Sequence, residues 1–145
     1  MRELPRQLSP DELAELFEGR TRLVELLAQR ENPLEEAPEV IAELSEEEKV
    51  EALNAHPAIG ARHLPERSAL EQGGTRDPAT LTELAYLNQV YEEKFGFRFV
   101  VFVERRPKTE ILEVLRERLE RSREEELDTG LGELVAIARD RWQHS

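Results

Sequence analysis

The helical spacing of the apolar residues is the feature that most limits how this chain can fold. Apolar residues recur every three or four positions through most of the sequence, as in Leu13, Leu16 and Phe17. Two capping boxes, Ser9–Glu12 and Ser45–Glu48, mark helix starts, because the Ser hydroxyl and the Glu carboxylate each accept a hydrogen bond from a backbone N–H group. We therefore predict an all-α fold built from successive amphipathic helices.

Residues that cap or break helices separate the predicted elements. A second helix begins after Thr21 and is broken by Pro33, and a short third segment follows before Ser45. We expect the helix that opens at Pro78 to be the longest, with Gly96 as its C-cap, because glycine readily adopts the left-handed conformation needed there. The apolar sets after the first are Leu23, Val24, Leu26 and Leu27; Val40, Ile41 and Leu44; Val50 and Leu53; Leu81, Leu84, Ala85, Leu87, Val90 and Tyr91; Ile111, Leu112, Val114, Leu115 and Leu119; and Leu127, Leu131, Leu134, Val135, Ile137 and Ala138.

The stretch of residues 97–103 is the only one typical of a β-strand. Apart from Arg98 it consists of Phe and Val, which favour extended backbone. Because the sequence offers no second strand to pair with it, we predict a short buried extended segment rather than a sheet. A length of 145 residues fits one domain, so we predict a single compact multi-helix domain over residues 1–145.

The chain is strongly acidic. Its 32 Asp and Glu residues outnumber its 20 Lys and Arg residues, which gives a net charge of -12. This charge argues against nucleic acid and against an anionic membrane surface as partners, because phosphate binding needs a basic patch. It would also repel an anionic substrate at long range, so a site for such a substrate must contain its own cation.

The residue types present give no sign of a metal site or a disulfide. The absence of cysteine excludes disulfides, thiolate nucleophiles and Cys-ligated zinc. His63 and His144 lack partners at ligand spacing, so we predict no metal. No stretch approaches the roughly 18 apolar residues of a membrane span, and we find neither a signal core nor a peroxisomal address. We expect a soluble cytoplasmic protein.

A histidine interrupts the apolar pattern at the end of a predicted helix. The helix that starts after Ser45 must end near Ala55 and His56, because a residue that precedes proline, here Pro57, avoids the helical conformation. One interpretation is a turn in which His56 caps a carbonyl group. The other is a rigidly placed acid–base group, since the usual pKa of histidine is near neutral pH.

Two further positions have both a structural and a functional interpretation. Ser68, Glu71 and Gln72 surround one leucine before a Gly-Gly pair, which is typical of a surface turn but would also suit a catalytic carboxylate. Arg141 continues the apolar stripe of the last helix at helical spacing. Its side chain either extends out to solvent at the helix end or directs its guanidinium into a cavity, where it would supply the cation that an anionic substrate needs.

Short motifs follow one another in a fixed order from His56 to Arg141. They are His56–Gly60, Ser68–Gln72, Leu87–Tyr91, Lys94–Val100, Ile111–Leu119, Glu133–Ile137 and Arg141. This ordered set, above all the Lys-Phe-Gly-Phe segment with His-Pro and Glu-Gln upstream, resembles the 2-oxo-4-hydroxy-4-carboxy-5-ureidoimidazoline (OHCU) decarboxylase family. The resemblance covers most of the chain and extends to the predicted helix pair that contains Phe17–Gly19.

The resemblance implies an all-α homodimer without metal or organic cofactor. It implies a carboxy-lyase that converts the anionic ureidoimidazoline to (S)-allantoin at the end of urate breakdown. His56 would be the acid–base group, Glu71 would orient the ring or its hydroxyl, and Arg141 would bind an anionic or carbonyl oxygen. The remaining substrate-binding residues implied by the resemblance are Pro57, Ser68, Gln72, Phe99, Val100, Val101, Phe102 and Val103.

The chemistry of such a substrate suits the residue types of this chain. A ring imine beside the carboxylate can accept the electrons that remain when carbon dioxide leaves, so no cofactor is needed. The protein has to orient the carboxylate and move protons. Two other interpretations remain open: a non-catalytic acidic helical interaction domain on the same scaffold, and a related small-ring decarboxylase or lyase. Convergence of His56, Glu71, Gln72 and Arg141 on one pocket would favour an enzyme.

Overall fold

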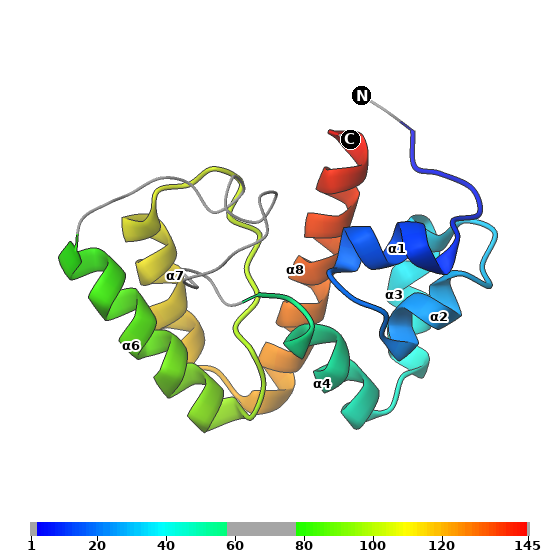
Figure 1. Ribbon diagram of the computed structural model, residues 1–145. Helices are drawn as coiled ribbons and strands as arrows, with labels where there is room; N and C mark the ends of the chain where they lie inside the picture. The colour runs from blue at the N-terminus through cyan, green and yellow to red at the C-terminus, as the bar shows by residue number, and fades with distance from the viewer. Residues whose placement is uncertain (1–2, 58–77, 145) are drawn as a thin grey trace.

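The computed structural model describes residues 3–57 and 78–144, and these are mostly helical (Figure 1). They contain no β-strand, so the predicted all-α class is confirmed. None of their helices is long and apolar enough to cross a membrane. The helices are α1 (Pro10–Phe17), α2 (Arg22–Leu27), α3 (Pro33–Glu43), α4 (Glu46–Asn54), α6 (Pro78–Phe95), α7 (Lys108–Leu119) and α8 (Arg123–Gln143).

Helix α8 lies in the middle of the described structure (Figure 1). Helices α1, α3 and α4 pack against it on one side, while α6 and α7 pack against each other on the other side. Gly130 lets α4 approach α8 closely, because a Cβ atom at this position would lie 3.1 Å from Leu53 Cδ2. This approach matters for the site, since α4 ends next to His56 and α8 carries Arg141.

Local capping signals set the helix starts as the sequence predicts. Both predicted capping boxes form, with Ser9 Oγ accepting a hydrogen bond from Glu12 N at 3.1 Å and Ser45 Oγ accepting one from Glu48 N at 3.2 Å. Gly96 ends α6 with a φ of 82°. That value lies in the left-handed region, where glycine is favoured over residues that carry a Cβ atom.

Two helices differ in length from the prediction. Helix α8 has 21 residues and is longer than α6, which has 18. The sequence did not indicate this length, because the first turn of α8 is acidic and lacks the apolar residues by which the helix was located. Helix α3 begins at Pro33 and includes Pro38, so it is longer than the short segment predicted. Pro38 has no N–H group for the carbonyl of Leu34. Arg139 of α8 supplies the missing donor, with Nε and Nη2 at 3.0 and 2.7 Å from Leu34 O.

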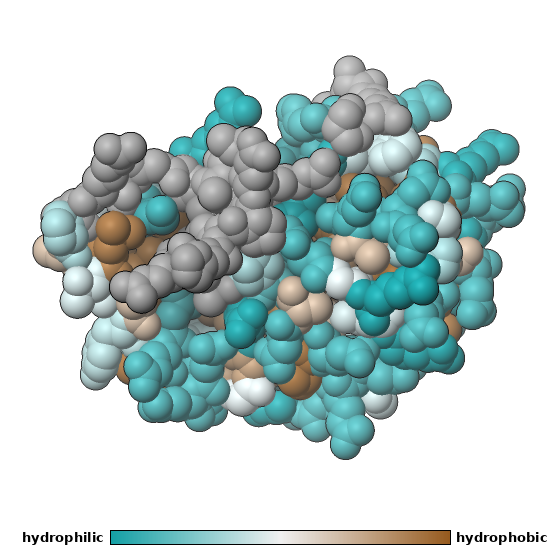
Figure 2. Space-filling view, viewed as in Figure 1, coloured by the Kyte–Doolittle hydropathy of each residue, from teal (hydrophilic) through white to brown (hydrophobic). Residues whose placement is uncertain are grey.

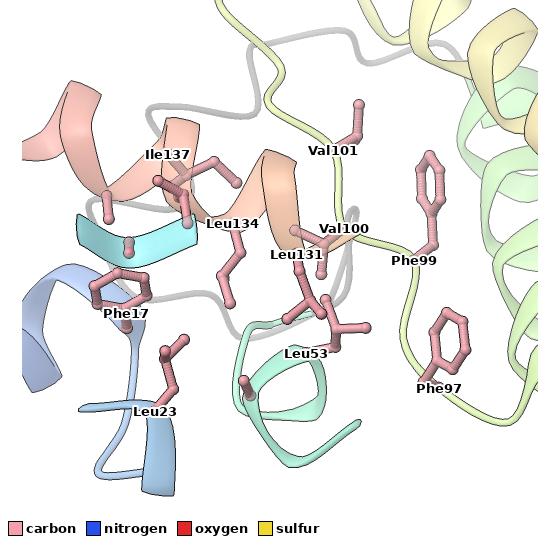
Figure 3. Close-up of a cluster of buried hydrophobic side chains, with 14 of the residues drawn as sticks. Phe17, Leu23, Leu53, Phe97, Phe99, Val100, Val101, Leu131, Leu134 and Ile137 are labelled. Carbon is pink, nitrogen blue, oxygen red and sulfur yellow. The ribbon is translucent and has the colours of Figure 1, made fainter. Parts of the chain in front are cut away.

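Residues 97–103 form the predicted extended segment, which runs between α6 and α8 (Figure 3). The ring of Phe99 packs against Tyr91 of α6, with centroids 5.2 Å apart, while Val100 points toward Leu131 of α8. Both Phe99 and Val100 are buried. Full burial of side chains this size stabilises a fold by roughly 1.5–3 kcal/mol each, so the segment is a core element despite its irregular backbone.

A buried carboxylate joins the α6–α7 pair to α8. Glu126 is fully buried and accepts hydrogen bonds from Tyr91 Oη at 2.7 Å, Arg118 Nε at 2.7 Å and Arg121 Nη1 at 3.1 Å. Such a charge is tolerated in a core only when it is paired and hydrogen-bonded. Arg118 also donates from Nη1 to Val100 O at 2.7 Å, which ties the extended segment to the same cluster.

The visible surface is largely hydrophilic, as the charge of the chain requires (Figure 2). Apolar colour appears only in small areas on this face. Among the described residues, Tyr86 of α6 is the one large apolar side chain that is strongly exposed.

Candidate active site

His56 lies just beyond the end of α4 and is buried. Ala55 is the C-cap of this helix, and His56 N donates to Leu53 O at 3.2 Å before Pro57 ends the turn. His56 is 7% exposed, and its Nδ1 atom has no hydrogen-bond partner within residues 3–57 and 78–144. A buried imidazole nitrogen without a partner is costly. It is thus suited to a ligand that can donate a hydrogen bond or a proton.

The surroundings of His56 keep its imidazole neutral. Burial, together with the nearby positive charges of Arg141 and Arg98, lowers the pKa of His56 to about 3. The sequence interpretation used the ordinary near-neutral pKa, which does not hold in this environment. At neutral pH the imidazole is therefore uncharged, and a nitrogen without a proton can accept a hydrogen bond from a ligand.

Arg141 is buried, which decides between the two orientations that the sequence left open. Its side chain is 0% exposed, with Nη2 2.9 Å from Glu18 Oε1 and Nη1 donating to Leu16 O at 3.0 Å. The guanidinium therefore points into the molecule toward the end of α1, and its charge acts on His56. The acidic chain therefore contains a buried cation that lies close enough to His56 to affect its pKa.

Glu18 is a candidate site residue, because its carboxylate pairs with Arg141. It is the C-cap of α1 and has a φ of 64°, so the left-handed turn that ends α1 directs its side chain to Arg141. The only sequence signal for it is indirect: an inward arginine needs an acidic partner. Among 32 acidic residues, the sequence alone does not indicate which one that is.

Arg98 is a second residue near His56 that the sequence analysis did not assign to the site. Its Nη1 atom donates to the carbonyl oxygen of His56 at 2.7 Å and to that of Asn54 at 3.3 Å. Its Nε atom donates to Glu92 Oε1 at 3.3 Å. The extended segment thus contacts the end of α4 as well as α6.

The predicted substrate-binding stretch Phe99–Val103 lies in the core. Four of its five residues are buried, and Phe102 is half-buried. Its backbone is held by side chains, with Phe102 N donating to Glu133 Oε1 at 3.3 Å and Arg106 Nη2 donating to Phe102 O at 2.6 Å. These contacts fix the stretch in place, so any groups it offers to a ligand are preorganised.

The other predicted site residues lie outside the described part of the chain. These are Ser68, Glu71 and Gln72. Pro57 is described and half-buried beside His56. Within residues 3–57 and 78–144, no three His, Cys, Asp or Glu side chains are grouped so that they could hold a metal ion.

The arrangement of helices matches that of two solved structures. A crystal structure of OHCU decarboxylase in the presence of (S)-allantoin aligns with a TM-score of 0.75 at 25% identity, over 90% of this chain and 94% of that one. A crystal structure of (S)-allantoin synthase, at 22% identity, has the same fold with a TM-score of 0.68 over 91% of this chain and 47% of that one. The chain is thus an all-α protein with the fold of OHCU decarboxylase.

The family model for OHCU decarboxylase matches residues 2–143. The chain therefore belongs to the OHCU decarboxylase family. A 2-oxo-4-hydroxy-4-carboxy-5-ureidoimidazoline decarboxylase of Halalkalicoccus jeotgali is 31% identical over 103 residues, or 68% of this chain and 58% of that protein. The uric acid degradation bifunctional protein TTL of Arabidopsis thaliana is 36% identical over 98 residues, or 61% of this chain and 30% of that protein. The aligned region spans less than two thirds of either relative.

Proposed function

We propose that this protein is a carboxy-lyase that decarboxylates 2-oxo-4-hydroxy-4-carboxy-5-ureidoimidazoline to (S)-allantoin in urate breakdown. Family membership supports the reaction class. The observation that carries the proposal is the buried, neutral His56 under the influence of the buried cation Arg141. Membership of an enzyme family also favours this proposal over a non-catalytic interaction domain.

Arg141 is proposed to hold an anionic or carbonyl oxygen of the substrate. The net charge of -12 repels anions at long range, so a local cation is needed to bind one. Because the guanidinium is withdrawn from solvent, its attraction for an oxygen anion is stronger than it would be in water. The carboxylate is thereby oriented before its bond to the ring breaks.

His56 is proposed to move the protons of the reaction. The carbon–carboxylate bond breaks, carbon dioxide leaves, and the bonding electrons pass to the adjacent ring imine. The hydroxyl on the carbon that carried the carboxylate gives up its proton and becomes a carbonyl, while the neighbouring ring carbon gains one on a single face. A substrate anion bound to Arg141 offsets the positive charge that lowers the pKa of His56, so the imidazole can accept the hydroxyl proton and return a proton to the ring carbon. The imine nitrogen, which receives the electrons, takes one proton from solvent, and this is the one proton that the reaction consumes overall.

The remaining roles are proposed from the family resemblance. Glu71 would orient the ring or the hydroxyl group, and Gln72, Ser68 and Pro57 would contact the polar edges of the substrate together with the stretch 99–103. No cofactor is required, because the ring imine of the substrate is itself the electron sink. We also propose a homodimer in the cytoplasm, which rests on the resemblance and on the sequence alone.

A coupled assay tests the proposal directly. The protein is added to urate, urate oxidase and the hydrolase that acts after it, and optically active allantoin is followed by circular dichroism. We expect (S)-allantoin to form faster than in the same mixture without the protein. An equal rate with and without the protein would refute the proposed function.

A further inference from the structure

The residues at the end of α4 and the start of the extended segment hold each other reciprocally. The side chain of Asn54 accepts a hydrogen bond from the backbone N–H of Arg98 at 2.9 Å. The side chain of Arg98 in turn donates to the carbonyl oxygens of Asn54 at 3.3 Å and of His56 at 2.7 Å. We call this set of contacts between Asn54, Arg98 and His56 the Asn54–Arg98 clasp.

The clasp holds the peptide group that follows His56, which is one of the two peptide groups that flank its Cα atom. On its N-terminal side His56 is held by the bond from its N–H to Leu53 O at 3.2 Å. On its C-terminal side the His56 carbonyl belongs to the planar peptide bond with Pro57, and the short contact from Arg98 fixes that plane. With both flanking peptide groups held, only the two side-chain torsions of His56 remain to place its imidazole.

Arg98 is itself held in place on the side away from α4. Its Nε atom donates to Glu92 Oε1 of α6 at 3.3 Å, and its backbone follows Phe97, whose ring is buried against Tyr91 at a centroid distance of 6.1 Å. The last carbonyl groups of a helix lack hydrogen-bond partners within the helix, and at the end of α4 water could donate to them. An anchored arginine instead ties them to the segment that follows α6.

We propose that Arg98 and Asn54 are positioning residues that set the location of His56 relative to the extended segment 97–103 during catalysis. Neither residue touches the reacting atoms in this proposal, and both act through the His56 backbone. The inference rests on the proposed decarboxylase function, because His56 must be catalytic for its position to matter. A misplacement of about 1 Å in a catalytic group can lower the rate about 100-fold.

The test compares variants of the clasp with a matched arginine elsewhere. Arg30 suits as the control, because its side chain is 31% exposed like that of Arg98 and it also bonds carboxylates, those of Glu36 and Glu43, in the α2–α3 region. We expect R98M to lower kcat about 10–100-fold with KM changed less than about twofold, since the substrate contacts persist. R30M should retain the kcat and KM of the wild type.

Two further variants separate positioning from a general loss of stability. R98K keeps the charge and one donor, so it should recover part of the kcat lost in R98M. N54A removes only the acceptor for the Arg98 N–H, and the double variant N54A/R98M should lower kcat less than the product of the single effects, because both disrupt the same contact set. If R98M does not fold, R98K and N54A carry the test.

The outcomes distinguish the clasp from the proposed function. If the wild type forms (S)-allantoin and the clasp variants lower the thermal midpoint while keeping the wild-type kcat, the clasp only stabilises the fold and our inference is wrong. If R30M lowers kcat as much as R98M, the effect is not specific to His56 and the inference is also wrong. If the wild type itself gives no (S)-allantoin, the proposed function fails first, and the positioning role with it.

Discussion

Arg141, in the last helix, lies with its Nη2 atom 2.9 Å from Oε1 of Glu18, at the end of the first helix. The pair joins α8 to α1 and brings a buried positive charge close enough to lower the pKa of His56. Because the guanidinium is held by Glu18 and by the carbonyl of Leu16, its orientation exists before any substrate binds. A preorganised cation of this kind is more effective than one that must be recruited from solvent.

Replacing Arg141 by Lys is expected to weaken substrate binding more than turnover. The charge remains, but the planar fork that can contact Glu18 and a substrate oxygen together is lost. A hydrogen bond to a charged group contributes about 1.5–3 kcal/mol, so KM should rise roughly 10–100-fold. Steady-state kinetics measure this change, and an unchanged KM would show that Arg141 does not contact the substrate.

Replacing Glu18 by Gln should lower the free energy of unfolding and not only the catalytic activity. The change removes the carboxylate from a pair whose arginine side chain is 0% exposed. Breaking a buried ion pair by removing one partner costs about 3 kcal/mol or more. Urea denaturation measures the free energy of unfolding, with Glu43→Gln as the control, since Glu43 is a largely exposed partner of Arg30. Equal losses in the two variants would contradict the role assigned to Glu18.

How much the sequence could predict depends on how far apart the contacting residues are. The capping boxes at Ser9 and Ser45 were predictable because each involves residues three positions apart. The bond between Arg139 and Leu34 spans 105 positions, and nothing near Arg139 in the sequence indicates it. The inward direction of Arg141 was undecidable for the same reason, since the Leu16 carbonyl that holds it lies 125 positions away.

The same principle limits what could be predicted of the site. His56 was identifiable because a polar residue before Pro57 interrupts an apolar pattern. Its low pKa depends on burial and on Arg98 and Arg141, which the fold brings near from distant parts of the chain. The clasp role of Arg98 was hidden, because main-chain carbonyls leave no residue-type signal in a sequence.

Arg139 donates to the carbonyl that Pro38 cannot serve, so the effect of replacing Arg139 on stability should depend on whether residue 38 is proline. We expect R139A to destabilise the protein by about 1–3 kcal/mol, because the buried carbonyl of Leu34 loses its donors. In a P38A background the new N–H group can bond to that carbonyl within α3, so R139A should cost less there. Chemical denaturation of the two single variants and the double variant measures the difference, and strict additivity would contradict the explanation.

The lowered pKa of His56 predicts how stability changes with pH. The pKa is about 3 in the folded protein and 6.5 for the ordinary group, so the unfolded chain binds the extra proton between these values. The contribution of neutral His56 is therefore fully present above pH 6.5 and is lost as the pH falls toward 3. Between pH 7 and pH 5, the stability of the wild type should fall by about 2 kcal/mol more than that of H56Q.

An NMR titration checks the same prediction without unfolding the protein. The ring resonances of His56, assigned by their absence in H56Q, should stay constant from pH 8 to pH 5. A His56 ring that titrates near pH 6.5 would show that burial and the two arginines do not keep it neutral.

The sharpest prediction concerns His56 and Glu71. Replacing His56 by Gln should preserve the fold, because the turn between Ala55 and Pro57 is set by the backbone and tolerates a polar side chain of similar reach. It should remove acid–base catalysis, which typically contributes about 10²–10⁴-fold to the rate. Replacing Glu71 by Ala should also lower turnover, while the thermal midpoint of each variant stays near that of the wild type.

The structural interpretation of the same residues predicts the opposite result. If His56 only ends α4 and Glu71 only lies in a polar turn, their replacement should change the thermal midpoint slightly and leave turnover intact. Nδ1 of His56 does not serve as a cap, because it has no hydrogen-bond partner within the described residues. A His56→Gln protein that produces (S)-allantoin at the wild-type rate would therefore exclude His56 as the group that moves the protons.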